Sequence, residues 1–90
     1  MKERIYISGP ITGTDHYQEA FKKAEEELGK EGFETVNPAS ISQTLPDGME
    51  YEEIMAVDLC LLNMCSSIYM LEGWEKSRGA NREYGYALAK

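Results

Sequence analysis

The amino-acid sequence predicts a small α/β domain of flavodoxin-like or Rossmann-like type, a three-layer sandwich around a parallel sheet of strand order 2-1-3. Short runs rich in β-branched and aromatic residues alternate with longer segments whose apolar residues recur at helical spacing. Tight glycine turns join the first strand, helix and strand, which is typical of a βαβ unit. Residues 1–90 suffice for one domain, and the expected sandwich is truncated after its third helix.

The first strand is predicted at residues 4–8, where Arg-Ile-Tyr-Ile-Ser ends at a Gly-Pro pair. A glycine-bearing loop covers residues 9–15, and Asp15 is placed to cap the helix that follows. Two glycines end that helix, which is predicted from apolar residues at helical spacing: Tyr17, Ala20, Phe21, Ala24 and Leu28.

The middle of the chain supplies a strand, a long loop, a second helix and a third strand. The second strand is predicted at residues 33–36. A polar loop is predicted at residues 37–49, and loops of this length without regular structure more often have a function than not. The second helix is predicted at residues 50–63 and the third strand at residues 66–71. An acid, Asp58, occupies an inward position among the apolar residues of the second helix, which are Ile54, Val57, Leu61 and Leu62.

Residues 73–88 predict a loop that leaves the third strand and enters a third helix. Ser77 is suited to cap this helix, because its hydroxyl can accept a hydrogen bond from the first turn. Glu83 shares one helical face with Ala80, Tyr84 and Ala87. A carboxylate that faces inward loses its hydration, so it requires a hydrogen-bond or charge partner or has a functional role. Gly79 lies one turn before Glu83 and leaves room for another group to approach the helix.

The predicted topology directs several polar residues to one crevice. In a 2-1-3 sheet the switch point lies between strands 1 and 3, beyond their carboxyl ends, where the loops at residues 9–15 and 72–77 both arrive. Tyr6, Asp58 and Glu83 can converge there. Two inward acids, a tyrosine and a helix N-terminus suit chemistry at a glycosidic bond. One carboxylate would attack or stabilise the anomeric carbon, and the other would protonate the leaving group.

These three residues also have purely structural interpretations. Glu83 can be an ordinary surface charge beside Arg82, although its place on the apolar face favours an inward role. Asp58 can be a buried acid satisfied by a backbone or arginine partner. Tyr6 can be a core residue at the end of its strand.

Composition and charge limit the classes of partner. The net charge of −7 argues against a nucleic-acid polymer, because phosphate contacts require clustered Lys and Arg. Cys60, Cys65 and the single histidine do not form a metal-binding pattern, and no metal or cofactor is predicted. Neither a signal-peptide pattern nor an apolar run of roughly 20 residues is found, so we expect a cytoplasmic protein with reduced, buried thiols and no membrane contact.

Three features of the sequence resemble the nucleoside 2-deoxyribosyltransferase-like superfamily. The likeness spans nearly the whole chain, and it is nearest to short, often phage-borne members. The superfamily includes nucleoside deoxyribosyltransferases and deoxynucleoside 5′-monophosphate N-glycosidases, so the resemblance implies cleavage or transfer at an N-glycosidic bond. The features are the run Tyr-Ile-Ser-Gly-Pro-Ile-Thr-Gly at residues 6–13, Asp58, and the motif Ser77-x-Gly79-x-x-x-Glu83-x-Gly85-x-Ala87.

The resemblance implies a role for each matching residue. Glu83 matches the nucleophile that forms a covalent link to C1′ of the sugar. Asp58 matches the acid that assists departure of the base, and Tyr6 matches the tyrosine whose hydroxyl orients the nucleophile. Ser77 and Gly79 match positions that hold the 5′ end of the sugar in the phosphate-preferring branch.

The sequence also departs from the superfamily pattern. The transferase branch has an aspartate in place of Ser77, which favours the nucleotide branch here. The phosphate-preferring branch has a serine and an arginine where this chain has Pro10 and Thr12, so the need for a 5′-phosphate stays open. The family sheet normally continues after the nucleophile helix, whereas this sequence ends at Lys90 and leaves the third strand as an edge. Because family members assemble as oligomers, we expect at least a homodimer.

Loop residues near the crevice are further candidates for substrate binding. Thr12 and Asn37 can meet sugar hydroxyls. Trp74 can stack on a nucleobase, or it can equally be a partly exposed hydrophobic plug or a dimer contact. The full set of predicted loop contacts is Gly9, Ile11, Thr12, Asn37 and Trp74.

Three functions remain open from the sequence. The first is an N-glycosidase or deoxyribosyltransferase that acts on a nucleoside or nucleoside 5′-monophosphate through Glu83. The second is a binding protein that sequesters a nucleotide-derived ligand in the same pocket without turnover, which the altered first loop favours. The third is a small interaction module that dimerises through its edge strand and has no ligand.

Overall fold

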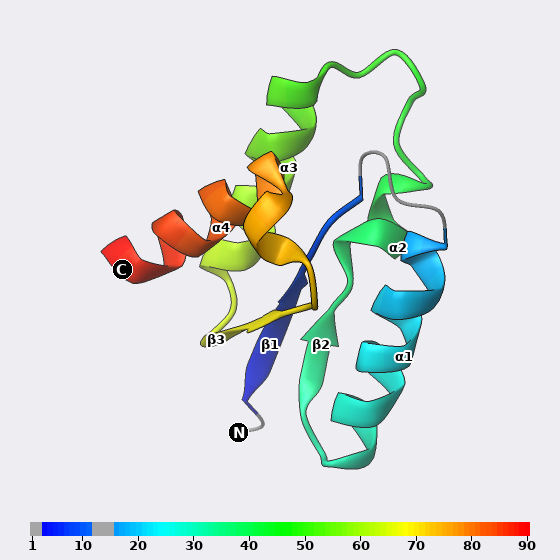
Figure 1. Ribbon diagram of the computed structural model, residues 1–90, viewed down its shortest axis with the longest axis vertical. Coiled ribbons are helices and arrows are strands. Elements are labelled where there is room, and N and C mark those ends of the chain that lie inside the picture. Colours follow the sequence, from blue (N-terminus) through cyan, green and yellow to red (C-terminus); the bar gives the residue numbers. More distant parts are fainter. Residues whose placement is uncertain (1–2, 12–15) are drawn as a thin grey trace.

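The computed structural model describes residues 3–11 and 16–90 (Figure 1). Strands and helices alternate along the chain, and a short 3₁₀ helix precedes the last α-helix. In chain order the elements are β1 (Arg4–Ser8), α1 (Tyr17–Lys30), β2 (Glu34–Val36), α2 (Pro38–Ser42), α3 (Tyr51–Asn63), β3 (Ser67–Met70), η1 (Trp74–Lys76) and α4 (Arg78–Ala89).

The three strands form one parallel sheet with β1 in the centre, in the order β2-β1-β3. Tyr6, in the middle of β1, lies opposite Val36 of β2 and Ile68 of β3. Parallel strands require crossover connections, and the helices between the strands supply them. The predicted α/β fold with sheet order 2-1-3 is therefore confirmed.

Alternation of side chains along β1 gives the sheet two different faces. Ile5 and Ile7 are buried on the α1 side, in an apolar core cluster with Phe21, Ala24, Leu28 and Ala39. Tyr6 and Ser8 point to the other side, where α3 and α4 pack against each other and α4 contacts β1 and β3. Figure 1 shows α1 on one side of the sheet and α3 with α4 on the other. β1 thus gives apolar side chains to the α1 face of the sheet and polar groups to the other face.

The segment at residues 37–49, predicted as a loop, contains the short helix α2. The Asn37 side chain accepts hydrogen bonds from the backbone N–H groups of Ala39 at 3.0 Å and Ser40 at 3.3 Å. Pro38 stands at the start of the helix, where its missing N–H costs nothing. The Asn-Pro pair therefore starts a helix as well as ending β2, and the described part of the chain has four α-helices where three were expected.

Other local predictions also need correction. Cys60 is exposed and Cys65 is partly buried, both as free thiols, so the predicted burial of both is wrong. The Tyr84 side chain is 36% exposed and does not join the inward face of its helix. Asp15, the predicted cap of the first helix, lies outside the described residues. No helix in those residues is long and apolar enough to cross a membrane.

Gly9 has a packing role at the end of β1. A Cβ atom at this position would lie 2.7 Å from Cβ and 2.9 Å from Cδ1 of Leu71. The Leu71 N–H donates to the carbonyl oxygen of Ser8 at 2.8 Å, which holds the two chain segments at this spacing. Only glycine allows this close approach of the segments that follow β1 and β3.

We predict that Gly9→Ala lowers the free energy of unfolding by about 1–3 kcal/mol, because the added methyl group must displace Leu71. Gly29→Ala is the matched control, since a Cβ there would meet no atom within 4 Å. The control should leave stability unchanged or slightly raised. Urea denaturation of the three proteins measures the effect, and equal stability of Gly9→Ala and the wild type would contradict it.

Candidate active site

The two inward acids share one cavity of about 180 Å³ between the sheet, α3 and α4. Asp58 comes from α3 and Glu83 from α4, and both side chains are buried. The cavity lies beyond the carboxyl end of β1, where the switch point of a 2-1-3 sheet was expected. Its lining residues are Gly9, Ile11, Phe21, Pro38, Ser42, Tyr51, Ile54, Met55, Asp58, Ser77, Gly79, Ala80 and Glu83.

Both oxygens of the Glu83 carboxyl group accept hydrogen bonds from β1. The Tyr6 hydroxyl donates to Oε2 at 2.7 Å, and the Ser8 hydroxyl donates to Oε1 at 2.6 Å. The two donors are two residues apart on one strand, so they point to the same face of the sheet. Because Tyr6 and Ser8 are both 0% exposed, water does not compete for these bonds. The carboxyl group of Glu83 is therefore held in one orientation.

Asp58 has a different environment. The residue is 8% exposed, and within residues 3–11 and 16–90 its pKa is set by burial and the Glu83 charge, without the hydrogen bonds that Glu83 accepts. Burial raises the pKa of Asp58 to about 7, and the nearby charge of Glu83 adds to the increase. Two neighbouring carboxyl groups in a buried site cannot easily both be charged. With a pKa of about 7, the Asp58 carboxyl group holds a proton in a large fraction of the molecules near neutral pH.

Glu83 is the better site for the negative charge. Burial raises the pKa of Glu83, but the hydrogen bonds from Ser8 and Tyr6 act in the opposite direction, because they stabilise the charged form. Burial and the two carboxyl groups raise the pKa of Tyr6 far above its usual value, so this phenol stays protonated and remains a donor. The site therefore combines an acid of raised pKa with an oriented carboxylate.

The start of α4 forms one wall of the cavity. The Ser77 hydroxyl accepts a hydrogen bond from the Ala80 N–H at 3.1 Å, which confirms the predicted cap. Gly79 faces α3 at ordinary contact distance, since a Cβ there would lie 3.5 Å from Sδ of Met55 and 3.7 Å from the Tyr51 hydroxyl.

A cluster of charged and aromatic side chains ties α3 to α4 beside the cavity. The Arg82 guanidinium contacts both carboxylate oxygens of Glu52, at 2.9 and 3.2 Å. The guanidinium of Arg78 lies 4.7 Å from the centre of the Tyr51 ring, and that of Arg82 lies 5.6 Å from it. Tyr51 also lines the cavity, so this cluster fixes one of its walls. Arg82 thus pairs with Glu52, not with Glu83.

The structure brings some of the predicted binding residues to the cavity and leaves others elsewhere. Gly9, Ile11, Ser77 and Gly79 line it, as noted above. Trp74 does not line it, and its ring instead packs against Tyr84 with ring centres 4.9 Å apart.

Asn37 is also absent from the cavity lining. Its side chain caps α2 and is 7% exposed, so its oxygen is already used by the fold. Thr12 lies outside the described residues. The substrate-binding roles of all these residues stay predictions.

Sequence reasoning missed Ser8 and Tyr51. The signal for Ser8 was present, because a residue two positions after Tyr6 on a strand shares its direction. Tyr51 begins α3 and gave no pattern that distinguishes a cavity wall from an exposed surface. In the described residues, no group of three or more His, Cys, Asp or Glu side chains is arranged to hold a metal ion.

We predict that protein stability falls as the pH rises from about 4 to about 7. Folding raises the pKa of Asp58 from 3.8 to about 7, so the folded state binds more protons than the unfolded state over this range. Asp58→Asn cannot titrate and should show a weaker dependence, as measured by urea denaturation at several pH values. Glu26→Gln, at an exposed position, is the control. An Asp58→Asn profile parallel to that of the wild type would contradict the assignment.

Ser8→Ala should raise the pKa of Glu83, because it removes a hydrogen bond that stabilises the charged form. Tyr6→Phe should act in the same direction. Carbon-13 NMR titration of the glutamate carboxyl groups measures this pKa. Ser40→Ala, an exposed change on α2, is the control. An unchanged or lowered pKa in Ser8→Ala would show that the hydroxyl does not stabilise the charged carboxylate.

The comparison with protein-family models matches residues 3–90 to the family described as "Domain of unknown function (DUF4406)". Comparisons with curated proteins and with solved structures found no significant match. The matched range covers every element that contributes to the cavity, from β1 to α4. The chain therefore belongs to the DUF4406 family.

Proposed function

We propose that this protein cleaves or transfers the N-glycosidic bond of a nucleoside or nucleoside 5′-monophosphate, with Glu83 as the nucleophile. One observation carries the proposal: a carboxylate oriented by two buried hydroxyl groups shares a cavity with a second, buried carboxyl group whose pKa is raised. Most enzymes that act on glycosidic bonds use two carboxyl groups, one as the acid and the other as the nucleophile or base. The resemblance to the nucleoside 2-deoxyribosyltransferase-like superfamily supports the same assignment.

In the first step, a Glu83 oxygen forms a bond to C1′ while the bond from C1′ to the base nitrogen breaks. The leaving base takes the electron pair of that bond and receives a proton from Asp58. In the second step, Asp58 accepts a proton from water or from a second base, whose oxygen or nitrogen forms the new bond to C1′. Glu83 is released as a carboxylate, and Asp58 is again protonated.

The size of the cavity limits which part of the substrate it encloses. About 180 Å³ is less than the roughly 300–1,000 Å³ of a pocket that encloses a drug-sized ligand. We propose that the cavity holds the sugar and that the base extends beyond it. Ser77 and Gly79, at the start of α4, are the candidates for contact with the 5′ end. A free nucleoside and its 5′-monophosphate are both included in the proposal.

A second candidate function is sequestration of a nucleotide-derived ligand without turnover. The observation in its favour is that both Glu83 oxygens already accept hydrogen bonds. Such bonds stabilise the carboxylate and thereby lower its basicity, which weakens it as a nucleophile. Binding would then use the same cavity, and the two acids would select the ligand.

The proposal also covers the partners of the chain. The ligand is a small nucleoside or nucleotide, and the net charge of −7 disfavours a nucleic-acid polymer. We include at least a homodimer in the proposal, because the resembling proteins are oligomers. No cofactor is required by the chemistry, and a cytoplasmic location would supply the substrates.

Incubation of the purified protein with each deoxynucleoside and each 5′-monophosphate should release free base, which chromatography detects. Glu83→Gln should abolish the release. Asp58→Asn should slow it by about 10²–10⁴-fold, the usual contribution of a general acid. Glu26→Gln lies on the exposed side of α1 and should leave the rate unchanged.

Calorimetric titration of the same compounds distinguishes the two candidate functions. Stoichiometric binding without release of base would reject catalysis and support sequestration. Neither binding nor release with any compound would reject both functions.

A further inference from the structure

The two donors to Glu83 approach its carboxyl group from β1 and not from the cavity. Glu83 is part of the cavity wall, whereas Tyr6 and Ser8 are buried on β1 and are not part of that wall. A carboxylate has about four lone-pair sites, and the two hydroxyl groups use only part of them. Glu83 can therefore form a bond to a substrate in the cavity while both hydroxyl groups stay in contact with it.

Both hydrogen bonds are of the charge-assisted kind. The distances of 2.6 Å from Ser8 and 2.7 Å from Tyr6 are typical of a hydroxyl group that donates to a charged oxygen. Such bonds are weaker to an ester, because its oxygens carry no full charge. The two donors therefore stabilise the free carboxylate of Glu83 more than they stabilise Glu83 in a covalent link to C1′.

This difference has opposite effects on the two steps of the proposed reaction, on which this inference rests. In the first step, negative charge leaves Glu83 as the bond to C1′ forms, so the hydrogen bonds raise the barrier. In the second step, the charge returns to Glu83. Donors that are already in place then lower the barrier, as they do in an oxyanion hole. The link between sugar and enzyme consequently forms slowly and breaks quickly.

We propose that Ser8 is a positioning residue that makes the glycosyl-enzyme short-lived, so that water and not a second base takes the sugar. The water oxygen forms a bond to C1′, the bond from C1′ to the Glu83 oxygen breaks, and its electron pair stays on Glu83. A proton of the water passes to Asp58, which became a carboxylate when it protonated the leaving base. The protein is accordingly a hydrolase and not a transferase.

The lifetime of the link determines the acceptor. A second base reaches C1′ only after the first base has left the site and the second has taken its place. Water needs no such exchange, because it is present in large excess. A link that breaks quickly therefore goes to water, and a link that persists can go to a base.

Ser8 is better suited than Tyr6 to reveal this effect. The charges of both Glu83 and Asp58 raise the pKa of Tyr6, so a change at Tyr6 alters both acids. Ser8 is the last residue of β1, and its carbonyl oxygen accepts a hydrogen bond from the Leu71 N–H at 2.8 Å. The backbone of Ser8 is thus held by the neighbouring segment, and its hydroxyl group can be removed without loss of that contact.

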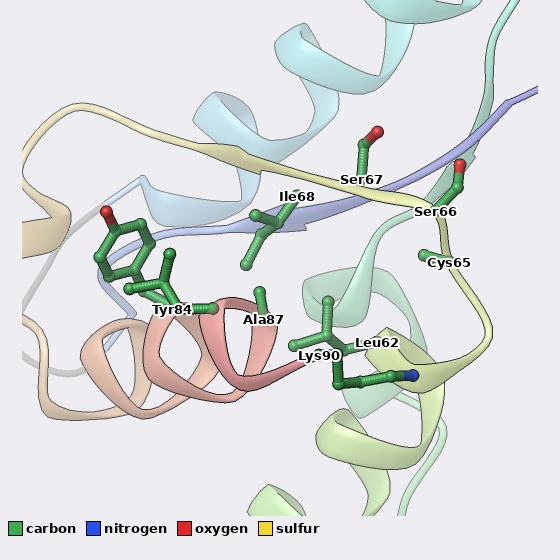
Figure 2. Close-up of a pocket in the computed structure, with 9 residues that line it drawn as sticks. Leu62, Cys65, Ser66, Ser67, Ile68, Tyr84, Ala87 and Lys90 are labelled. Carbon is green, nitrogen blue, oxygen red and sulfur yellow. The ribbon is translucent and has the colours of Figure 1, made fainter.

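A serine on the neighbouring strand supplies a matched control. Ser67 of β3 lies opposite Ile5, which belongs to the apolar cluster on the α1 side of the sheet. Figure 2 shows the Ser67 side chain directed away from α4, whereas Ile68 points toward that helix. Ser67→Ala therefore removes the same group as Ser8→Ala does, but on the face of the sheet that does not contain Glu83.

Rapid-quench kinetics and intact-protein mass spectrometry measure the two steps. The substrate is the deoxynucleoside or 5′-monophosphate from which the wild type releases base fastest. The wild type and Ser67→Ala should show no burst of base and no protein that carries sugar. Ser8→Ala should accumulate the sugar adduct and lose it more slowly than the wild type by about tenfold or more. This rate is calculated per adduct, so it does not depend on the ionisation of free Glu83. Ser8→Thr retains the hydroxyl group and should behave as the wild type.

Isotope exchange identifies the acceptor. A radiolabelled copy of the leaving base is added in excess, so that the base certainly fits the site. The wild type should release free sugar and incorporate no label into the substrate. Ser8→Ala should incorporate label, because its link lasts long enough for one base to replace another.

The inference and the proposed function fail in different ways. Incorporation of label by the wild type, or an adduct that accumulates on it, would overturn the role of Ser8 and leave cleavage through Glu83 in place. Ser8→Ala that accumulates no adduct would do the same. The wild-type measurements decide the matter even where Ser8→Ala does not fold. Absence of any base release by the wild type would reject the proposed function and this inference together.

Discussion

The hydrogen bonds from Ser8 and Tyr6 to Glu83 are the interaction on which the rest of this structure depends. They join the central strand to the last helix across residues that are far apart in the sequence. A carboxylate in this position would be costly without them, because burial removes it from water. With both oxygens satisfied, α4 can pack against the sheet with an acid on its inner face. The same bonds that allow the fold orient the group proposed to react.

The second acid, Asp58, differs from Glu83 in its proton affinity. Asp58 lines the same cavity but lacks the donors that Glu83 has within the described residues, so the two carboxyl groups differ in proton affinity for a structural reason. The cluster around Tyr51 ties together the two helices that carry them. A carboxylate beside a neutral acid suits substitution at an anomeric carbon, whereas two charged acids would repel each other and destabilise the fold.

The helix that supplies Glu83 lines two separate hollows. Its first turns line the cavity that contains the two acids, and its last turns line a second hollow of about 370 Å³ beside β3. The two hollows lie at opposite ends of one helix, which is 12 residues long.

The sequence by itself determined the strands, the main helices, the sheet order and the inward position of Asp58 and Glu83, because local periodicity decides which side of an element is buried. It also determined the cap at Ser77, which needs only neighbouring residues. Only the tertiary structure decided that Ser8 donates a hydrogen bond to Glu83 and that Trp74 packs on Tyr84 away from the cavity. These outcomes depend on which segments meet in space, and no local pattern encodes a contact between two different elements.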